Sequence, residues 1–540
     1  MRRGEGGLTR TPPPSLPAII ALARSGALGR ARRLFDEAGL RSVTDDPATL
    51  SVGGRLLKDE ARRAPAAERP RLWREAGDAY ARAAELSGAT YHLINAATLA
   101  LLAGDRGMAE ERARRVLDKL DAGDTGPETP YYLGATRAEA LLLLGRTDEA
   151  RAALEAARQL APEAWEDHAS TLRQFSLILE TLGGDGAWLA PLQPPRSLHF
   201  AGHMGVADSA DLRAHIATLL DEERIGFAWG ALAGGADLIV AEGVLARGAE
   251  LHLVLPAPAA VFRAESAAPL GGDWPDRFDA VLGRAASVHV VEPGLAATTM
   301  LHIRLAAEVA MGKAVMKAAS LASEAVQLLL ADPGAATSAT GLIGAHWLRG
   351  GRRQRRLDLP RDSADAAGGR PLPEAPGDGA LAAMLAVGFT GEGPAGGSVT
   401  PEALARAADA LADAGRPLTR PVVAGDVLHL AFADPAEASD AAGLIGGAFG
   451  PDAPRIAGHY GVVRRVEDPF GGSPALIGPA AGLAPDLLAS TPPGAIHVSE
   501  DFAAALHGWT PLSAGETAYV GDLSRAGETI SLYALAPAGR

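Results

Sequence analysis

The sequence predicts a multidomain chain in which all-α helical repeats are followed by a doubly wound α/β sheet and then by an α+β domain. Its 540 residues exceed what one hydrophobic core normally fills. Helical periodicity runs over 15–190, near-continuous apolar strands alternate with helices over 196–350, and mixed strands and helices occupy 381–540. We expect a disordered N-terminus at 1–14 and a flexible linker, rich in Gly, Pro and charge, at 351–380.

The composition limits the classes of protein to which the chain can belong. A net charge of −14 argues against a general binder of nucleic acid or of anionic membranes. The basic stretch from Arg349 to Arg361 is a local exception that fits a solvated linker better than a nucleic-acid patch. The absence of cysteine excludes disulfides and thiolate metal sites, and no apolar run is long enough to span a bilayer. We therefore expect a cytoplasmic protein with no nucleic-acid or membrane partner.

The helical region repeats itself. Small or apolar residues follow three glycines at offsets of five, nine and twelve residues. The three sets are Gly26, Ala31, Phe35 and Ala38; Gly145, Ala150, Leu154 and Ala157; and, more weakly, Gly104, Ala109, Ala113 and Val116. This pattern resembles the tetratricopeptide repeat (TPR), in which small residues let two antiparallel helices touch and Gly makes the turn between them; an ordinary Ala-rich bundle is the alternative. The resemblance implies a concave face that binds a protein partner.

In the second region the candidate site lies where strands end, because ligands bind at the carboxyl ends of strands in open parallel sheets. We expect strands at "SLHFAG", "IGFAWGAL", "AELHLVLP", "SVHVVEP" and "AVQLLLAD". The first ends at Gly202 and His203, and Gly234 and Gly235 follow the second, before a helix opened by Asp237. Glycines before a helix N-terminus let backbone N–H groups close on an anion, although a tight turn explains them equally well. His203 could donate to a phosphate or ribose hydroxyl, or be structural.

The stretch "FAGHM … GGADLIVAEGVLARGAELHLVLP" resembles the SLOG superfamily (the SMF/DprA and LOG proteins), whose Rossmann-like domains bind nucleotides or nucleotide-derived ligands. It is most similar to the version found beside TPR and cyclase domains in bacterial signalling proteins, also labelled TRAFs-binding domain proteins. That group continues into an RF-containing helix, and "DWPDRFDAVLGRA" carries Trp274, Arg277 and Phe278 here. The resemblance implies a ligand cleft lined by Gly202, His203, Gly234, Gly235 and Glu242.

Glu242 has two interpretations. It could meet a ribose or act as a hydrolytic base, or it could be a buried acid paired with an arginine such as Arg247 or Arg277. Members that cleave N-glycosidic bonds carry "PGGxGTxxE", whereas this chain has "LAGGADLIVAE". The departure favours ligand binding over hydrolysis.

The third region resembles the class III adenylate/guanylate cyclase catalytic domain, which has a ferredoxin-like βαββαβ core. The matching landmarks are "VGFT", the hairpin "AGDVLHLAF" around Asp426, "TPPGAIHVSEDF" and "YVGD". Cyclase sites are assembled from two facing domains, so the resemblance implies a homodimer through this region, or pairing with a competent partner that supplies the missing groups.

The catalytic positions of that family are mostly replaced. Cyclisation needs two metal ions held by two aspartates, and these positions match Leu385 and Asp426. The base-reading lysine aligns with Val422, and the Asn and Arg of the family fall at about Gly478 and Gly482. One carboxylate cannot hold two ions, so we expect Asp426 to be a vestigial metal ligand that serves as a turn residue, and magnesium not to bind.

Together these resemblances predict a bacterial signalling or regulatory protein. The repeats would bind a protein partner, the SLOG-like domain a nucleotide-type ligand, and a degenerate cyclase-homology domain would dimerise or transmit the signal. No other cofactor is expected. The alternatives are a nucleotide-processing hydrolase that uses Glu242, a residual cyclase that uses Asp426, and a scaffold whose sheet binds nothing.

Overall fold

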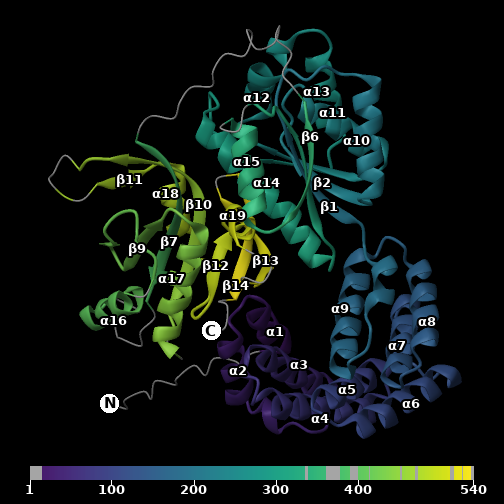
Figure 1. Cartoon of the computed structure of the whole chain (residues 1–540). Coiled ribbons are helices and arrows are strands. Elements are labelled where there is room, and N and C mark those ends of the chain that lie inside the picture. Colours follow the sequence, from purple (N-terminus) through teal and green to yellow (C-terminus); the bar gives the residue numbers. More distant parts are fainter. Residues whose placement is uncertain are drawn as a thin grey trace, which may run out of the picture. The chain divides into compact units, whose positions relative to one another are not determined.

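The computed structural model describes residues 15–334, 338–359, 378–389, 399–412, 414–450, 453–468, 472, 474–510, 516–525 and 527–536. The chain divides into two compact units, Met1–Ala164 with Arg173–Leu192, and Trp165–Leu172 with Gln193–Arg540 (Figure 1). The N-terminus expected to be disordered, 1–14, lies outside the described residues, as does most of the expected linker. No described helix combines the length and the apolar character needed to cross a bilayer.

The first unit is a stack of antiparallel helices. The helices are α1 (Leu16–Arg24), α2 (Leu28–Glu37), α3 (Pro47–Arg63), α4 (Arg69–Ser87), α5 (Thr90–Leu102), α6 (Arg106–Ala122), α7 (Pro130–Leu143), α8 (Thr147–Leu160) and the second part of α9 (Trp165–Leu182), whose residues Trp165–Leu172 belong to the second unit. Gly26, Gly104 and Gly145 stand in the turns α1–α2, α5–α6 and α7–α8, each with a φ between 73° and 86°. L-residues with side chains rarely adopt this conformation, so glycine makes these turns as the offsets predict.

A parallel sheet opens the second unit. Its described strands are β1 (Arg196–Gly202), β2 (Ile225–Gly230), β3 (Glu250–Leu255), β4 (Ser287–Val290), β5 (Ala325–Ala331) and β6 (Arg353–Asp358), in the order β4-β3-β2-β1-β5-β6. The helices are α10 (Ala210–Glu222), α11 (Ala236–Ala246), α12 (Ala259–Ser266), α13 (Trp274–Leu282), α14 (Met300–Ser320) and α15 (Ala339–Arg349). The strand order reverses between β1 and β5, which makes the sheet doubly wound as expected.

The linker expected at 351–380 begins later than predicted, because a strand occupies its first residues. Residues Arg353–Asp358, assigned above to that linker, form the parallel edge strand β6. Arg353 and Arg356 are exposed, as expected of a solvated stretch, but Arg353 and Arg355 also pair with the buried carboxylate of Glu223. Composition indicated a linker, but backbone pairing with β5 makes the stretch a strand.

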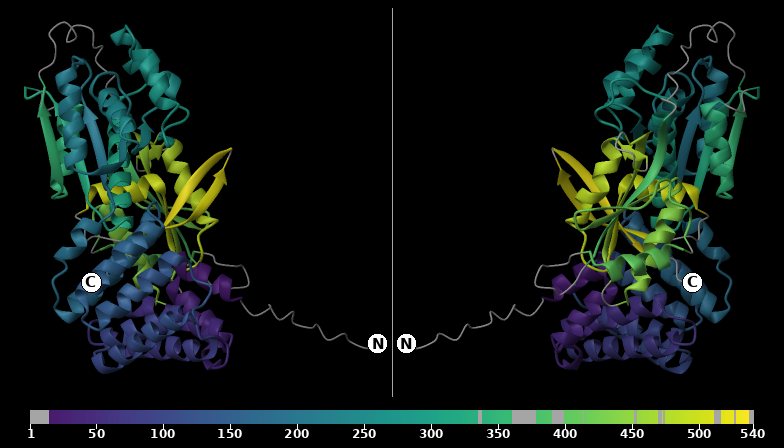
Figure 2. Two further views of the ribbon diagram at one scale, coloured as in Figure 1. Left: turned by 90° about the vertical axis from the view of Figure 1, so that its right-hand side faces the viewer. Right: turned by 90° about the vertical axis from the view of Figure 1, so that its left-hand side faces the viewer.

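A mixed sheet completes the second unit. Its strands are β7 (Gly379–Gly388), β8 (Val422–Ala424), β9 (Val427–Phe432), β10 (Arg455–Val466), β11 (Ala475–Ile477), β12 (Ile496–Ser499), β13 (Glu516–Arg525) and β14 (Glu528–Ala536); its helices are α16 (Pro401–Leu411), α17 (Pro435–Ala448), α18 (Pro479–Leu488) and α19 (Glu500–Trp509). The series β7-α16-β8-β9-α17-β10 has the spatial order β10-β7-β9-β8, the ferredoxin-like arrangement. Beyond β12, the hairpin β13–β14 extends as a twisted two-stranded ribbon (Figure 2).

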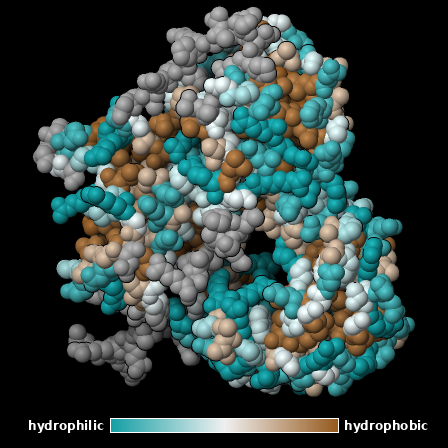
Figure 3. All heavy atoms as spheres, in the orientation of Figure 1, coloured by the Kyte–Doolittle hydropathy of each residue, from teal (hydrophilic) through white to brown (hydrophobic). Residues whose placement is uncertain are grey.

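The two sheets share one hydrophobic core. Phe227 and Trp229 of the parallel sheet belong to the same buried cluster as Leu385, Phe432 and Phe502 of the mixed-sheet part. Helix α14 lies between the sheets and contributes buried residues to this cluster (Figure 1). On the face shown in Figure 3, hydrophilic residues surround the apolar ones, which form separate patches.

Candidate functional site

The candidate site is at the carboxyl edge of the parallel sheet, where β1 and β2 meet the N-terminus of α11. Three predicted glycines are required there by packing. A Cβ on Gly202 would lie 2.2 Å from the Cβ of Ala236, and a Cβ on Gly234 would lie 2.9 Å from a backbone carbonyl oxygen. Gly235 adopts a φ of 97° as the residue before α11. The structure thus brings Gly202, Gly234 and Gly235 to the same edge of the sheet, where the absence of side chains lets neighbouring segments pack closely.

Asp237, on the first turn of α11, fastens this edge. Its buried carboxylate accepts hydrogen bonds from the backbone N–H of Gly202 (2.8 Å) and of Ala233 (3.4 Å). Burial raises the pKa of Asp237 to about 7, and the two backbone N–H groups act against that rise. The carboxylate therefore joins the end of β1 to the loop after β2, and it occupies two amides that an anion could otherwise use.

His203 is buried between two carbonyl oxygens. Its Nδ1 lies 2.8 Å from the carbonyl oxygen of Met204, and its Nε2 lies 2.9 Å from that of Leu359, just after β6. A neutral imidazole has one N–H and can donate to only one of them. In this structure His203 holds the segment after β6 against the end of β1, which is the structural role considered for it above.

Glu242 is an ion-paired acid. Its Oε1 and Oε2 accept from Nε and a terminal nitrogen of Arg277 at 2.8 and 2.9 Å, and Oε2 also accepts from Arg213 at 2.8 Å. Of the two arginines proposed as partners, Arg277 is in place, while Arg247 pairs with Asp221. Both carboxylate oxygens are thus engaged, which does not suit a hydrolytic base.

The sequence analysis missed two members of this ion-pair network. Asp208, in the loop after β1, accepts two hydrogen bonds from Arg213 and a third contact from Arg277 at 3.0 Å. The Arg213 hydrogen bonds hold the pKa of Asp208 below its usual range. The Arg277 guanidinium also lies 4.2 Å from the ring centroid of Trp274. The five-residue spacing of Asp208 and Arg213 was a weak signal, and their link to α13 needed the fold.

The predicted metal position stands apart from this edge. Asp426 is exposed at the β8–β9 turn, after Gly425 with a φ of 59°. Leu385, at the position of the first metal-binding aspartate, is buried in β7 opposite Leu430. Across the described part of the chain, no group of three or more His, Asp or Glu residues is arranged to hold a metal ion.

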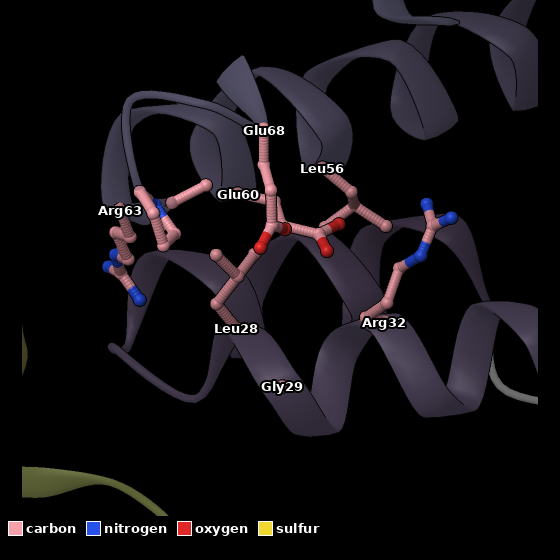
Figure 4. A pocket seen from close by; sticks show the side chains of 9 residues that line it. Leu28, Gly29, Arg32, Leu56, Glu60, Arg63 and Glu68 are labelled. Carbon is pink, nitrogen blue, oxygen red and sulfur yellow. The ribbon is translucent and has the colours of Figure 1, made fainter. Parts of the chain in front are cut away.

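The first unit contains a pocket of about 430 Å³. Its lining consists of Leu28, Gly29, Arg32, Leu56, Glu60, Arg63, Ala64, Pro65 and Glu68. Figure 4 shows the side chains of Glu60 and Glu68 reaching over the same space above Leu28, while Arg32 and Arg63 lie on opposite sides of it. The pocket has an apolar floor and a rim with charges of both signs.

Comparison with known proteins supports the repeats. A family model described as Tetratricopeptide Repeats-Sensor matches residues 18–100, which include Gly26 and the pocket. No curated protein matches the chain. Solved structures similar to it include adenylyl cyclase CyaB from P. aeruginosa (14% identity, 30% of this chain and 95% of that one, TM-score 0.24). Another is an adenylate/guanylate cyclase/hydrolase from Silicibacter pomeroyi (20% identity, 30% of this chain and 98% of that one, TM-score 0.24). The TPR prediction is confirmed over the matched residues.

Proposed function

We propose that this chain is a signalling or regulatory protein that binds a nucleotide-type ligand at the carboxyl edge of its parallel sheet. The TPR-type repeats bind a protein partner, and the cyclase-like sheet transmits the bound state or dimerises instead of catalysing. The observation that carries the proposal is the glycine-lined junction of β1, β2 and α11, which lies next to the reversal of strand order.

Two features of the junction support an anionic ligand. The amides of Gly234 and Gly235 take part in none of the hydrogen bonds found among the described residues. They precede α11, whose N-terminus carries partial positive charge. Protonation of Asp237 near neutral pH would remove the negative charge of the carboxylate that is hydrogen-bonded to Gly202 and Ala233. Together with the resemblance to SLOG domains, these features favour phosphate groups of a nucleotide.

The cyclase-like part is proposed to be catalytically silent. The turn carboxylate of Asp426 has no second acid in the place taken by the buried Leu385. A single exposed carboxylate cannot neutralise a triphosphate and orient two ions, so this region offers a surface instead of a reaction. The hydrolase alternative is disfavoured because Arg277 and Arg213 already bind both oxygens of Glu242.

Nucleotide binding is tested with the full chain. Titration calorimetry and thermal shift with ATP, GTP, ADP and ADP-ribose should give binding to at least one, with no released base or phosphate by chromatography. Gly235→Ala should abolish binding, because its φ of 97° and backbone neighbours at 3.1–3.3 Å leave no room for a methyl group.

Gly248→Ala is the matched control for that variant. Gly248 follows α11 with a φ of 70° and open space around it, so its substitution carries similar backbone strain at a distance from the junction. Equal loss in both variants, or no binding by the wild-type chain, would refute the proposed ligand site.

A further inference from the structure

Helix α19 belongs by sequence to the cyclase-like part, yet it packs along α14 of the parallel-sheet part (Figure 1). A Cβ on Gly312 of α14 would lie 1.7 Å from the carbonyl oxygen of Ala504, so the two backbones touch. One turn later on α19, a Cβ on Gly508 would lie 3.4 Å from the carbonyl oxygen of Glu308. At Gly312 the contact leaves no space for a side chain, so the two helices are closely packed there.

A buried carboxylate lies in the middle of the contact. Glu308 of α14 is almost fully buried, and its Oε1 accepts from Nε of Arg304 at 2.7 Å. Its Oε2 accepts from the hydroxyl of Tyr460 on β10 at 2.7 Å and from Nε1 of Trp509 on α19 at 3.2 Å. Burial, and then the charge of Glu308, raises the pKa of Tyr460, which keeps its hydroxyl a donor. A buried charge is costly without such partners, so Glu308 depends on the cyclase-like part.

The N-terminal end of α19 is held by ion pairs. Asp501 pairs with Nε2 of His289 at the end of β4 (2.7 Å), and Glu500 pairs with Nζ of Lys313 on α14 (2.9 Å). Both acids lie in the first turn of α19, where negative charge is favourable. The parallel-sheet part thus supplies an imidazole and an ammonium group to this helix end.

The C-terminal end of α19 is capped by Arg352, which lies between α15 and β6. Its buried guanidinium donates to the carbonyl oxygens of Gly508 (3.0 Å) and Thr510 (2.5 Å), and also to that of His507. The last carbonyls of a helix have no partner within the helix and carry partial negative charge. The parallel-sheet part therefore completes both ends of a helix that belongs to the other sheet.

We propose that α14 and α19 form a rigid coupling element through which the two sheets unfold and respond as one body, with Glu308 as a positioning residue. A change that lowers the unfolding equilibrium constant of one sheet then lowers that of the other by the same factor. Binding at one sheet likewise changes binding at the other, and the effect is reciprocal. Two domains joined only by a tether would lack this property. The coupling is expected for any change in the stability of either sheet. Only the experiment with added nucleotide rests on the proposed function.

Hydrogen exchange of the full chain tests the coupling with a perturbation far from it. Leu487 of α18 is fully buried in a core cluster of the mixed sheet that contains no parallel-sheet residue. Leu487→Ala should accelerate the slowest amides of β7 and β10 by roughly 30-fold or more. The slowest amides of β1 and β3 should accelerate by the same factor. Leu487→Val serves where the alanine variant does not fold.

Glu308→Gln tests whether Glu308 transmits the effect of the Leu487 variant, which a residue that only adds stability would not do. In the Glu308→Gln background, the acceleration by the Leu487 variant should be confined to the mixed sheet. In the Asp279→Asn background, which weakens an ion pair with Arg263 away from α19, it should still reach both sheets. Acceleration limited to the mixed sheet in the otherwise wild-type chain would overturn the proposal, as would unchanged transfer in Glu308→Gln.

Added nucleotide forms a separate arm. A nucleotide that binds should protect the amides of both sheets equally, and protection of the parallel sheet alone contradicts the coupling. If no nucleotide binds, the proposed ligand site fails while the Leu487 comparison still decides the coupling.

Discussion

Replacing Asp237 by asparagine should change how the stability of the second unit depends on pH. The carboxylate is buried among backbone N–H donors of Gly202 and Ala233, and its pKa is raised to about 7 by burial. In the unfolded chain an aspartate has a pKa of ~3.9. Between these values the folded state binds one proton that the unfolded state does not. The free energy of unfolding therefore falls as pH rises through this window.

The magnitude follows from the two pKa values. Each pH unit in the window corresponds to about 1.4 kcal/mol for one proton, and the loss levels off as Asp237 ionises in the folded state above pH 7. From pH 5 to pH 8 the wild type should lose roughly 2.5 kcal/mol relative to Asp237→Asn. The stabilising contribution is complete below about pH 4, where the carboxyl is protonated in both states.

The assay is hydrogen exchange of peptides covering β1 and α11, with wild type and variant compared at each pH so that intrinsic exchange rates cancel. The ratio of opening constants should change by close to 10²-fold between pH 5 and pH 8. Asp221→Asn is the control, because the Arg247 hydrogen bond lowers the pKa of that exposed acid and its ratio should stay flat. A flat ratio for Asp237→Asn, or one that changes in the opposite direction, would refute the reasoning.

Three further predictions concern other parts of the chain. Gly312→Ala should destabilise the second unit by about 2 kcal/mol or more in urea denaturation, because the added methyl group would overlap the carbonyl oxygen of Ala504. The control is Gly446→Ala, at a helix position with open space, which should be neutral or stabilising by up to ~1 kcal/mol. Gly145→Ala should cost the helical unit about 1–2 kcal/mol, measured by circular dichroism, because its φ is 73°; a neutral result would contradict the turn assignment. Asp426→Ala should leave cyclic-nucleotide output with Mn²⁺ at background, as in the wild type, and shift stability by less than ~0.5 kcal/mol. A wild-type rate that this substitution abolishes would contradict the silent cyclase-like part.

Features set by local chemistry were predictable from the sequence. Gly26 and Gly145 could be placed in turns because a positive φ leaves few alternatives to glycine. Strands β1, β2, β3 and β5 were predictable because strands that are mostly buried require near-continuous apolar runs. The edge strand β6 lacks such a run, and its arginines resemble a linker until their partner Glu223 is brought near.

The candidate site was predictable only in part, for the same reason. Gly202, Gly234, Gly235 and Asp237 lie at strand ends and at a helix start, and the structure brings them together. The spacing of residues did not decide which arginine pairs with Glu242, because Arg277 lies on another helix, 35 positions further along the chain. Sequence patterns give the elements, whereas ion pairs between elements depend on the fold.

The landmark "TPPGAIHVSEDF" of the cyclase resemblance has a physical explanation in this structure. Ser499 caps α19 by accepting from the backbone N–H of Phe502, and Glu500 and Asp501 occupy the first turn. These acids bind Lys313 and a histidine of the parallel-sheet part, so the motif serves the contact between the sheets. In contrast, the metal position at Leu385 is apolar and buried. In this motif the acids serve to hold α19, whereas the side chain of Leu385 offers no ligand to a metal ion, and both features are what a structural role for this part of the chain requires.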